Sequence, residues 1–148
     1  MENSDYMRYA LSLATEAAEN GEVPVGCIVV DGSGKIIGRG RNRREETGKA
    51  TAHAEIEAIE MACDAKKDWR LDDCSLYVTL EPCPMCAGAI INARVGKLYY
   101  GAKEPKSGSC GSIINLFMEN YGYSPEIYGG LLGKECAGVM RDFFEKIR

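Results

Sequence analysis

The stretch SLYVTLEPCPMC, residues 75–86, decides the fold because it joins an apolar run directly to a helix start that carries two cysteines. Residues 75–80 predict a β-strand. The prolines at positions 82 and 84 favour a helix start, where a backbone amide has no helical partner in any case. A helix over residues 84–92 then crosses to a parallel strand over residues 97–101 in the right-handed sense. Such sheets bind ligands at the carboxyl ends of their strands, which is where this stretch places Cys83 and Cys86.

The segments on either side extend this unit in both directions. An amphipathic pattern capped by Ser4 and Asp5 predicts a first helix, and a turn-rich link at residues 31–34 predicts a hairpin. The expected elements are helix 4–20, strands 25–30 and 35–42, a helix after His53, strand 75–80, helix 84–92, strand 97–101, helix 113–118, strand 126–128 and helix 132–147. This order predicts one α/β domain over residues 1–148, with a five-stranded mixed sheet between helical layers.

His53, the single histidine of the chain, precedes the two cysteines by thirty positions or more. Cys83 and Cys86 lie three residues apart, so the first turn of a helix presents both sulfurs on one face. Together with His53 they make three zinc ligands, whereas a structural zinc site is normally closed by four. The ligand count therefore predicts a catalytic zinc site, one ion per subunit, whose fourth position belongs to water.

Glu55 supplies the group that a merely structural zinc clip would not need. It follows His53 by two positions, and such neighbours point apart within a helix, so this pair is expected where the chain enters a helix. Ile56, Ile59 and Cys63 are expected to continue the buried face of that helix. A carboxylate beside a zinc site can accept a proton and deliver it elsewhere, and Glu55 is therefore the expected catalytic acid and base. A catalytically silent subunit would have lost it.

The pattern H-x-E followed by P-C-x-x-C resembles the signature of the zinc-dependent nucleobase deaminases. Within that superfamily the chain is similar to the bacterial tRNA-specific adenosine deaminases over nearly its full length. The resemblance runs through GEVPVG (21–26), NR (42–43), TAHAE (51–55), WRL (69–71), LYVTLEPCPMCAGA (76–89), GA (101–102) and DFF (142–144). It implies the three-layer α/β/α cytidine-deaminase-like fold and a homodimer with RNA reaching across both subunits. The helices after His53 and Cys83 are expected to form the dimer interface.

The resemblance also implies how the substrate is held. Asn42 is expected to hydrogen-bond the target base, although a turn-facing asparagine at a strand end is an alternative. Lys106, in a Gly- and Ser-rich loop that otherwise suggests a linker, is the candidate phosphate contact. Phe143 and Phe144 are candidates for stacking near a nucleotide, with plain packing as the alternative.

The expected reaction is hydrolytic deamination of a base flipped out of an anticodon loop. Asn42 and the backbone amide of Ala54 grip the base, while Glu55 passes a proton from water to the ring N1 and, in a separate step, protonates the departing amine. The predicted function is conversion of adenosine to inosine at the wobble position, 34, of tRNA. The zinc motif alone does not separate adenine from cytosine chemistry, so deamination of a free base or nucleoside such as guanine, cytosine or cytidine remains an alternative.

The net charge of the chain bears on how it could bind RNA. A net charge of −4 and a pI near 5.1 argue against binding nucleic acid through overall charge. The one dense basic run, Arg39, Arg41, Arg43 and Arg44, is either a solvated face or a local phosphate contact. Residues 44–50 and the pair Gly122–Tyr123 depart from the family pattern. With no signal peptide and no apolar run long enough to cross a bilayer, the chain is expected in the cytoplasm.

Overall fold

Strand β1 (Gly26–Val30) lies inside the sheet, and all five of its residues are buried. The computed structural model describes residues 1–147, and within them the strand order is β2-β1-β3-β4-β5. Strands β2 (Ile36–Arg41) and β3 (Ser75–Leu80) flank β1, and both pair with β1 in the antiparallel sense. This arrangement explains why residues 25–30 form an unbroken apolar run, because a strand covered on both faces and both edges meets no water.

The second half of the sheet is parallel. Strand β3 pairs with β4 (Lys97–Ala102), which pairs in turn with β5 (Glu126–Gly129). Helix α4 (Pro84–Asn92) connects β3 to β4 as the sequence predicts. The sheet is therefore mixed and five-stranded, which confirms the predicted fold class.

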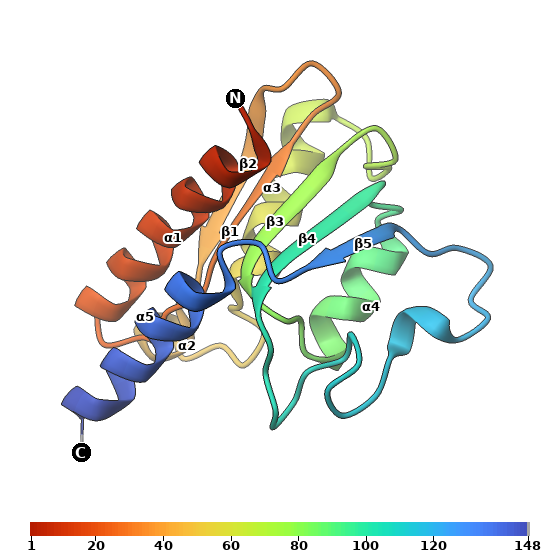
Figure 1. Ribbon diagram of the computed structural model, residues 1–148. Helices are drawn as coiled ribbons and strands as arrows, with labels where there is room; N and C mark the ends of the chain where they lie inside the picture. The colour runs from red at the N-terminus through yellow and green to blue at the C-terminus, as the bar shows by residue number, and fades with distance from the viewer. Residues whose placement is uncertain (148) are drawn as a thin grey trace.

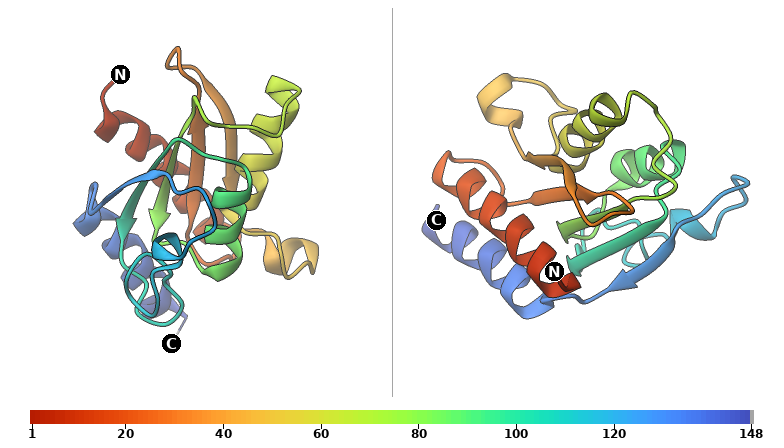
Figure 2. Two further views of the ribbon diagram at one scale, coloured as in Figure 1. Left: turned by 90° about the vertical axis from the view of Figure 1, so that its right-hand side faces the viewer. Right: turned by 90° about the horizontal axis from the view of Figure 1, so that it is seen from above.

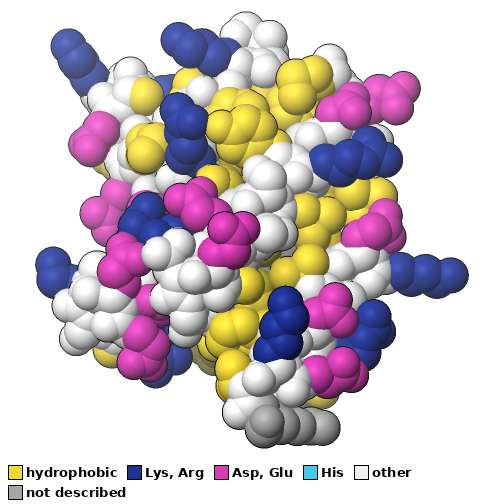
Figure 3. All heavy atoms as spheres, turned by 90° about the vertical axis from the view of Figure 1, so that its left-hand side faces the viewer, with side chains coloured by type: hydrophobic (Ala, Val, Ile, Leu, Met, Phe, Trp, Pro, Cys, Tyr) yellow, Lys and Arg dark blue, Asp and Glu magenta, His cyan; other side chains and the backbone are white. Residues whose placement is uncertain are grey.

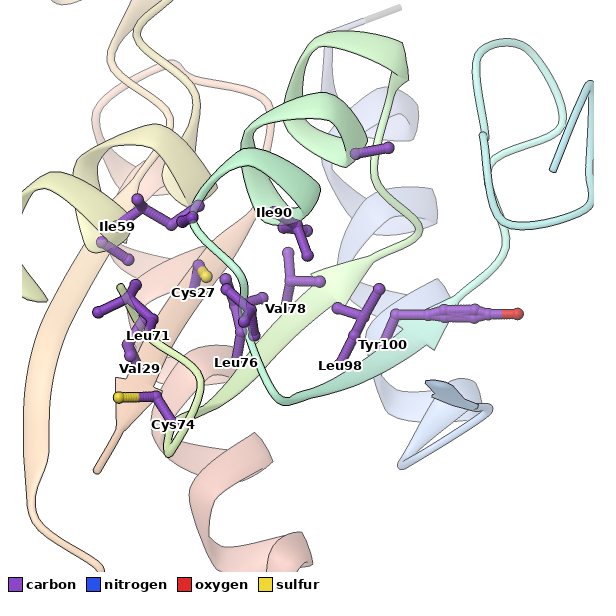
Figure 4. Packing of buried hydrophobic residues seen from close by; sticks show 14 of the residues in the cluster. Cys27, Val29, Ile59, Leu71, Cys74, Leu76, Val78, Ile90, Leu98 and Tyr100 are labelled. Atoms are coloured by element: carbon purple, nitrogen blue, oxygen red, sulfur yellow. The ribbon is translucent and has the colours of Figure 1, made fainter. Parts of the chain in front are cut away.

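Helices cover both faces of the sheet (Figures 1 and 2). Helices α1 (Asn3–Glu19) and α5 (Gly133–Lys146) run side by side on one face, while α3 (Ala54–Lys66) and α4 cover the other. The larger of two buried clusters lies beneath α3 and α4 and includes Leu76, Val78, Ile90 and Leu98 (Figure 4). A smaller cluster beneath α1 and α5 includes Met7 and Ile28.

Two glycines of β2 set the position of α3. A Cβ atom at Gly38 or Gly40 would overlap the carbonyl oxygen of Ala58 or Ala54, so the helix backbone lies directly on the strand. The buried face of α3 consists accordingly of Ala54, Glu55, Ala58, Ile59 and Ala62. Ile56 and Cys63, which the sequence places on this buried face, are only partly buried, although Cys63 still packs against the larger core cluster. Both residues lie to the side, facing a groove next to α4.

Some boundaries differ from those expected. The first helix is capped by Glu2, whose side chain and that of Asp5 form a reciprocal capping box, so Ser4 lies inside the helix. The helix expected over residues 113–118 shortens to a 3₁₀ turn, Leu116–Met118. A short helix that the sequence pattern did not predict, α2 (Arg44–Thr47), follows β2. Within residues 1–147 no helix is both long and apolar enough to cross a membrane.

Candidate metal centre and active site

Two helix N-termini bring the three predicted metal ligands together. His53 is the N-cap of α3 and Cys83 is the N-cap of α4, with Cys86 in the first turn of that helix. The Nδ1 atom of His53 lies 3.5 Å from Cys86 Sγ and 3.7 Å from Cys83 Sγ. It is the only such cluster of His, Cys, Asp or Glu side chains within residues 1–147.

These separations fit a tetrahedral zinc ion. Bond lengths of about 2.3 Å to sulfur and about 2.05 Å to nitrogen, at tetrahedral angles, place the nitrogen about 3.6 Å from each sulfur. The observed 3.5 and 3.7 Å match this value, so little movement is needed to form the coordination. The residues therefore suit a metal ion held by one imidazole and two sulfurs.

The cluster is electrostatically prepared for a cation. A hydrogen bond from the Cys86 thiol, assisted by one from His53, lowers the pKa of Cys83 to about 4. The Cys83 thiolate in turn raises the pKa of Cys86 through the same hydrogen bond, and it also raises the pKa of His53. One sulfur thus holds a proton shared within the cluster, and metal binding displaces such protons.

Glu55 lies in the first turn of α3 and is only 4% exposed. Burial raises its pKa to about 7, and the nearby negative charge of Cys83 acts in the same direction. A carboxyl group with this pKa accepts and donates a proton near neutral pH with almost equal ease. This position and pKa suit a group that transfers protons, and the catalytic role of Glu55 stays a prediction.

A cavity of about 160 Å³ opens beside these groups. Its lining comprises Val23, Val25, Asn42, Arg44, His53, Glu55, Leu80, Glu81, Cys83, Glu104 and Ser107. Sites for drug-sized ligands usually enclose roughly 300–1,000 Å³. The cavity is therefore suited to one small flat group inserted from outside.

Asn42 lies in the wall of this cavity, as the prediction required, but the amide of Ala54 does not act independently of it. The Ala54 N–H donates a 3.0 Å hydrogen bond to Asn42 Oδ1. The Ala54 amide is therefore engaged with the asparagine in this structure, and the expected contact of both groups with a base stays a prediction. The side-chain oxygen of Asn42 accepts this bond, and its side-chain nitrogen is the hydrogen-bond donor of the residue.

The other predicted substrate contacts lie outside the cavity. Lys106 is exposed on the loop beside Ser107. Phe143 and Phe144 pack edge-to-face on α5, with ring centroids 5.2 Å apart, and Phe143 borders a separate hollow shared with α1. Their contact with RNA stays a prediction.

Most of the basic run is already paired. Arg41 binds Glu46 at 2.9 Å and lies 3.5 Å from Glu16, while Arg43 binds Glu46 and Glu57. Arg44 differs, because it is exposed and lines the cavity. Figure 3 shows acidic and basic side chains interspersed over one face of the molecule. The arginine run is therefore mainly a structural network with one cation at the mouth of the site.

Sequence reasoning missed several wall residues, among them Glu81, Glu104 and Ser107. The sequence contains some indication of Glu81, because this residue lies within the stretch 75–86, two positions before the predicted ligand Cys83. The loop residues carried none, since a Gly- and Ser-rich segment looks the same whether it is mobile or folded against a site.

Metal-dependent nucleobase deaminases combine a three-ligand cluster of this kind with a glutamate that is not a ligand, and the fold and the site place the chain in that class. The family model for MafB19-like deaminases matches residues 1–148, and the chain belongs to this family.

The chain is also similar to individual proteins that, by their names, act on tRNA. The chain is 45% identical to a tRNA-specific adenosine deaminase of Bacillus subtilis (strain 168) over 144 residues, which cover 97% of this chain and 89% of that protein. It is also 45% identical to part of a tRNA(Ile)-lysidine synthase of Deinococcus radiodurans, of which it spans 24%. A solved structure from a study of tRNA:A34 deaminases superposes with a TM-score of 0.88 at 44% identity, covering 93% of this chain and 99% of that one.

Proposed function

We propose that this protein is a hydrolytic zinc-dependent deaminase that converts adenosine to inosine at the wobble position, 34, of tRNA anticodon loops and releases ammonia. The observation that carries the proposal is the pairing of three metal ligands with a buried, non-ligating Glu55 whose pKa lies near 7. Full-length similarity to tRNA-specific adenosine deaminases supports the choice of substrate. We further propose that residues 1–148 form one domain and that the protein works in the cytoplasm.

Zinc is the proposed metal, one ion per subunit, held by His53, Cys83 and Cys86. One imidazole and two thiolates form a donor set that zinc favours, and the nitrogen–sulfur separations of 3.5 and 3.7 Å fit its bond lengths. When bound, zinc would supply a water molecule acidified to a pKa of about 7.

The side chains would perform the remaining steps. Glu55 would accept one proton of the attacking water and deliver it to the ring N1 of adenine. It would later carry the second proton of that water, from the hydroxyl group then bonded to C6, to the departing amine. The side-chain nitrogen of Asn42, oriented by the Ala54 amide, would donate a hydrogen bond to the base.

The small cavity supports a base presented singly by RNA. A volume of about 160 Å³ accepts one base but not the nucleotides that flank it, so the target would have to be flipped out of its loop. The flanking phosphates would lie outside, within reach of exposed cations such as Lys106 and Arg44. Phe143 and Phe144 are proposed as more distant nucleotide contacts on α5.

A twofold assembly through α3 and α4 forms part of the proposal. The groove between these helices has a volume of about 350 Å³ and is lined by apolar residues that include Ile56, Ile59 and Ala89. Trp69 at its edge is 53% exposed. Large apolar side chains left exposed around a groove are typical of a surface that associates.

The decisive experiment offers the zinc-loaded protein several substrates in parallel. An anticodon stem-loop with adenosine at the wobble position is incubated beside the same stem-loop with guanosine there, and beside free adenosine, cytidine and guanine. Ammonia and inosine are expected from the adenosine stem-loop alone. Turnover of a free base or nucleoside with none of the RNA would overturn the tRNA assignment and favour the alternative deaminase.

A further inference from the structure

Glu81 is a buried carboxylate that the proposed chemistry does not use. It follows directly after β3, precedes Cys83 by two positions, and is 2% exposed. None of the ion pairs formed within residues 1–147 includes it. A buried carboxylate without a cation is costly unless hydrogen bonds satisfy its oxygens.

The hydrogen bonds to Glu81 come from a single loop, residues 103–112. One carboxylate oxygen accepts the Glu104 amide at 3.0 Å and the Ser112 hydroxyl. The other oxygen accepts the amides of Cys110 at 2.8 Å and Ser112 at 3.1 Å. Because its donors span both ends of the loop, the carboxylate acts as the centre around which the loop folds.

The loop backbone fits closely against this centre. The Ser109 amide donates a 2.8 Å bond to the carbonyl oxygen of Pro82, the next residue along the chain. A Cβ atom at Gly108 would overlap both the Glu81 carboxyl group and the Glu104 carbonyl oxygen. Residues 81 and 82 thus bind the loop to the same short segment that carries the metal ligand Cys83.

The loop contributes Glu104 and Ser107 to the wall of the base cavity. Its composition, with glycine and serine at five of the six positions from 107 to 112, does not by itself favour one conformation. Without the Glu81 carboxylate, the loop's three backbone amides and one hydroxyl that bind it would lose their hydrogen-bond acceptor. The shape of this wall therefore depends on Glu81.

We propose that Glu81 is a positioning residue, whose buried carboxylate holds residues 103–112 as a wall of the base cavity and so governs substrate capture. Glu81 itself also lines this cavity, and the proposal assigns its effect to the positions that it gives Glu104 and Ser107. The effect on capture rests on the proposed function, whereas the effect on the loop does not.

Glu81→Gln tests the proposal directly. The amide keeps the size of the carboxyl group, but its NH₂ group faces donors in either orientation, so at least one backbone amide loses its acceptor. Hydrogen exchange of the peptide spanning residues 103–113 is expected to accelerate roughly 10- to 100-fold in the zinc-loaded protein, as for loss of a hydrogen bond to a charged group. With the stem-loop, KM is expected to rise at least about tenfold while kcat changes less than about threefold, and zinc content stays at one per subunit.

Two matched variants separate this role from general effects. Glu119→Gln removes the same charge from an exposed position in the following segment and is expected to change none of these values. Ser112→Ala removes only the hydroxyl donor and is expected to give the same pattern in weaker form. It also serves as the test if Glu81→Gln does not fold.

Unchanged exchange of residues 103–113 in Glu81→Gln, or in Ser112→Ala if Glu81→Gln does not fold, would overturn the proposal. Loss of zinc, or a fall in kcat with KM unchanged, would overturn it too, because Glu81 would then serve the metal ligands or the chemistry. The exchange measurement requires no substrate. Failure of the wild-type protein to deaminate the stem-loop would therefore count against the proposed function and leave the effect on the loop to be judged separately.

Discussion

At the scale of single residues, the site depends on burial and hydrogen bonds that shift the pKa values of its ionisable side chains. Glu55 is buried against two sulfurs, and its pKa is raised to about 7 for that reason. Cys83 is held as a thiolate by hydrogen bonds from Cys86 and His53. The same burial that prepares these groups for chemistry makes them costly to fold without a metal ion.

Glu55→Gln is expected to leave zinc bound and to reduce turnover of the adenosine stem-loop at least about 1,000-fold, since the amide cannot carry the proton. Single-turnover assays with metal analysis measure both properties in one preparation. Substantial activity in this variant would remove Glu55 from its assigned role.

Glu55 should also make the metal-free protein sensitive to pH. Because its folded-state pKa is raised from 4.5 to about 7, the folded chain binds more protons than the unfolded chain between these values. Its contribution is therefore least unfavourable below pH 4.5, and stability is lost as the pH rises towards 7. At pH 8, metal-free Glu55→Gln is expected to be more stable than the wild-type chain by about 3 kcal/mol. Urea unfolding at pH 5 and pH 8 measures this, and equal differences at the two values would contradict it.

At the scale of elements, the ligands are positioned by how closely helices lie on strands. Gly38 and Gly40 allow α3 to rest on β2, and this fixes where the helix begins and so where His53 points. The short helix α2 is held in a similar way, because the buried Glu22 accepts the backbone amides of Glu45 and Glu46. The glycine contacts hold α3 against the sheet, and the Glu22 hydrogen bonds hold α2 beside the connection between α1 and β1. Both helices carry residues that line the cavity.

Gly40→Ala is expected to destabilise the protein by about 1–3 kcal/mol and to weaken metal binding, because the added methyl group meets the Ala54 carbonyl oxygen. Gly138→Ala provides the matched control. Its added carbon would meet only the end of the Arg141 side chain within a helix interior, where alanine is favoured by about 1 kcal/mol. Chemical denaturation and zinc titration of both variants should therefore show opposite signs in stability and a loss of affinity in Gly40→Ala alone.

At the scale of the whole molecule, the two faces of the sheet differ. Side chains of both charge signs are interspersed on the face of the molecule that Figure 3 shows. The groove between α3 and α4, helices that lie across the sheet from α1 and α5 (Figure 2), is lined mainly by apolar residues and bordered by Trp69. An acidic protein that binds RNA needs its cations at the site itself, because its overall field repels phosphate. Arg44 and Lys106 occupy such places near the cavity mouth.

Size-exclusion chromatography with light scattering is expected to give twice the chain mass of 16.2 kDa at working concentration. Ile56→Glu, in the groove between α3 and α4, is expected to shift the protein to a monomer because a buried charge would be left unpaired. Ile147→Glu makes the same change at an exposed residue after α5 and should remain dimeric. A monomeric wild-type protein would contradict the assembly.

The sequence by itself determined the layered fold and the chemical centre of this protein. Hydrophobic periodicity and proline positions are local signals, so β3 and α4 were predicted at their observed bounds. The spacing of His53, Glu55, Cys83 and Cys86 likewise reports a metal site without reference to the rest of the chain.

Only the tertiary structure decided how the cavity is enclosed. The pairing of Asn42 with the Ala54 amide, the place of Arg44 at the cavity mouth and the loop gathered around Glu81 all join residues that are distant in sequence. Such contacts depend on which backbone groups remain unpaired after the sheet has formed, and no local pattern records them.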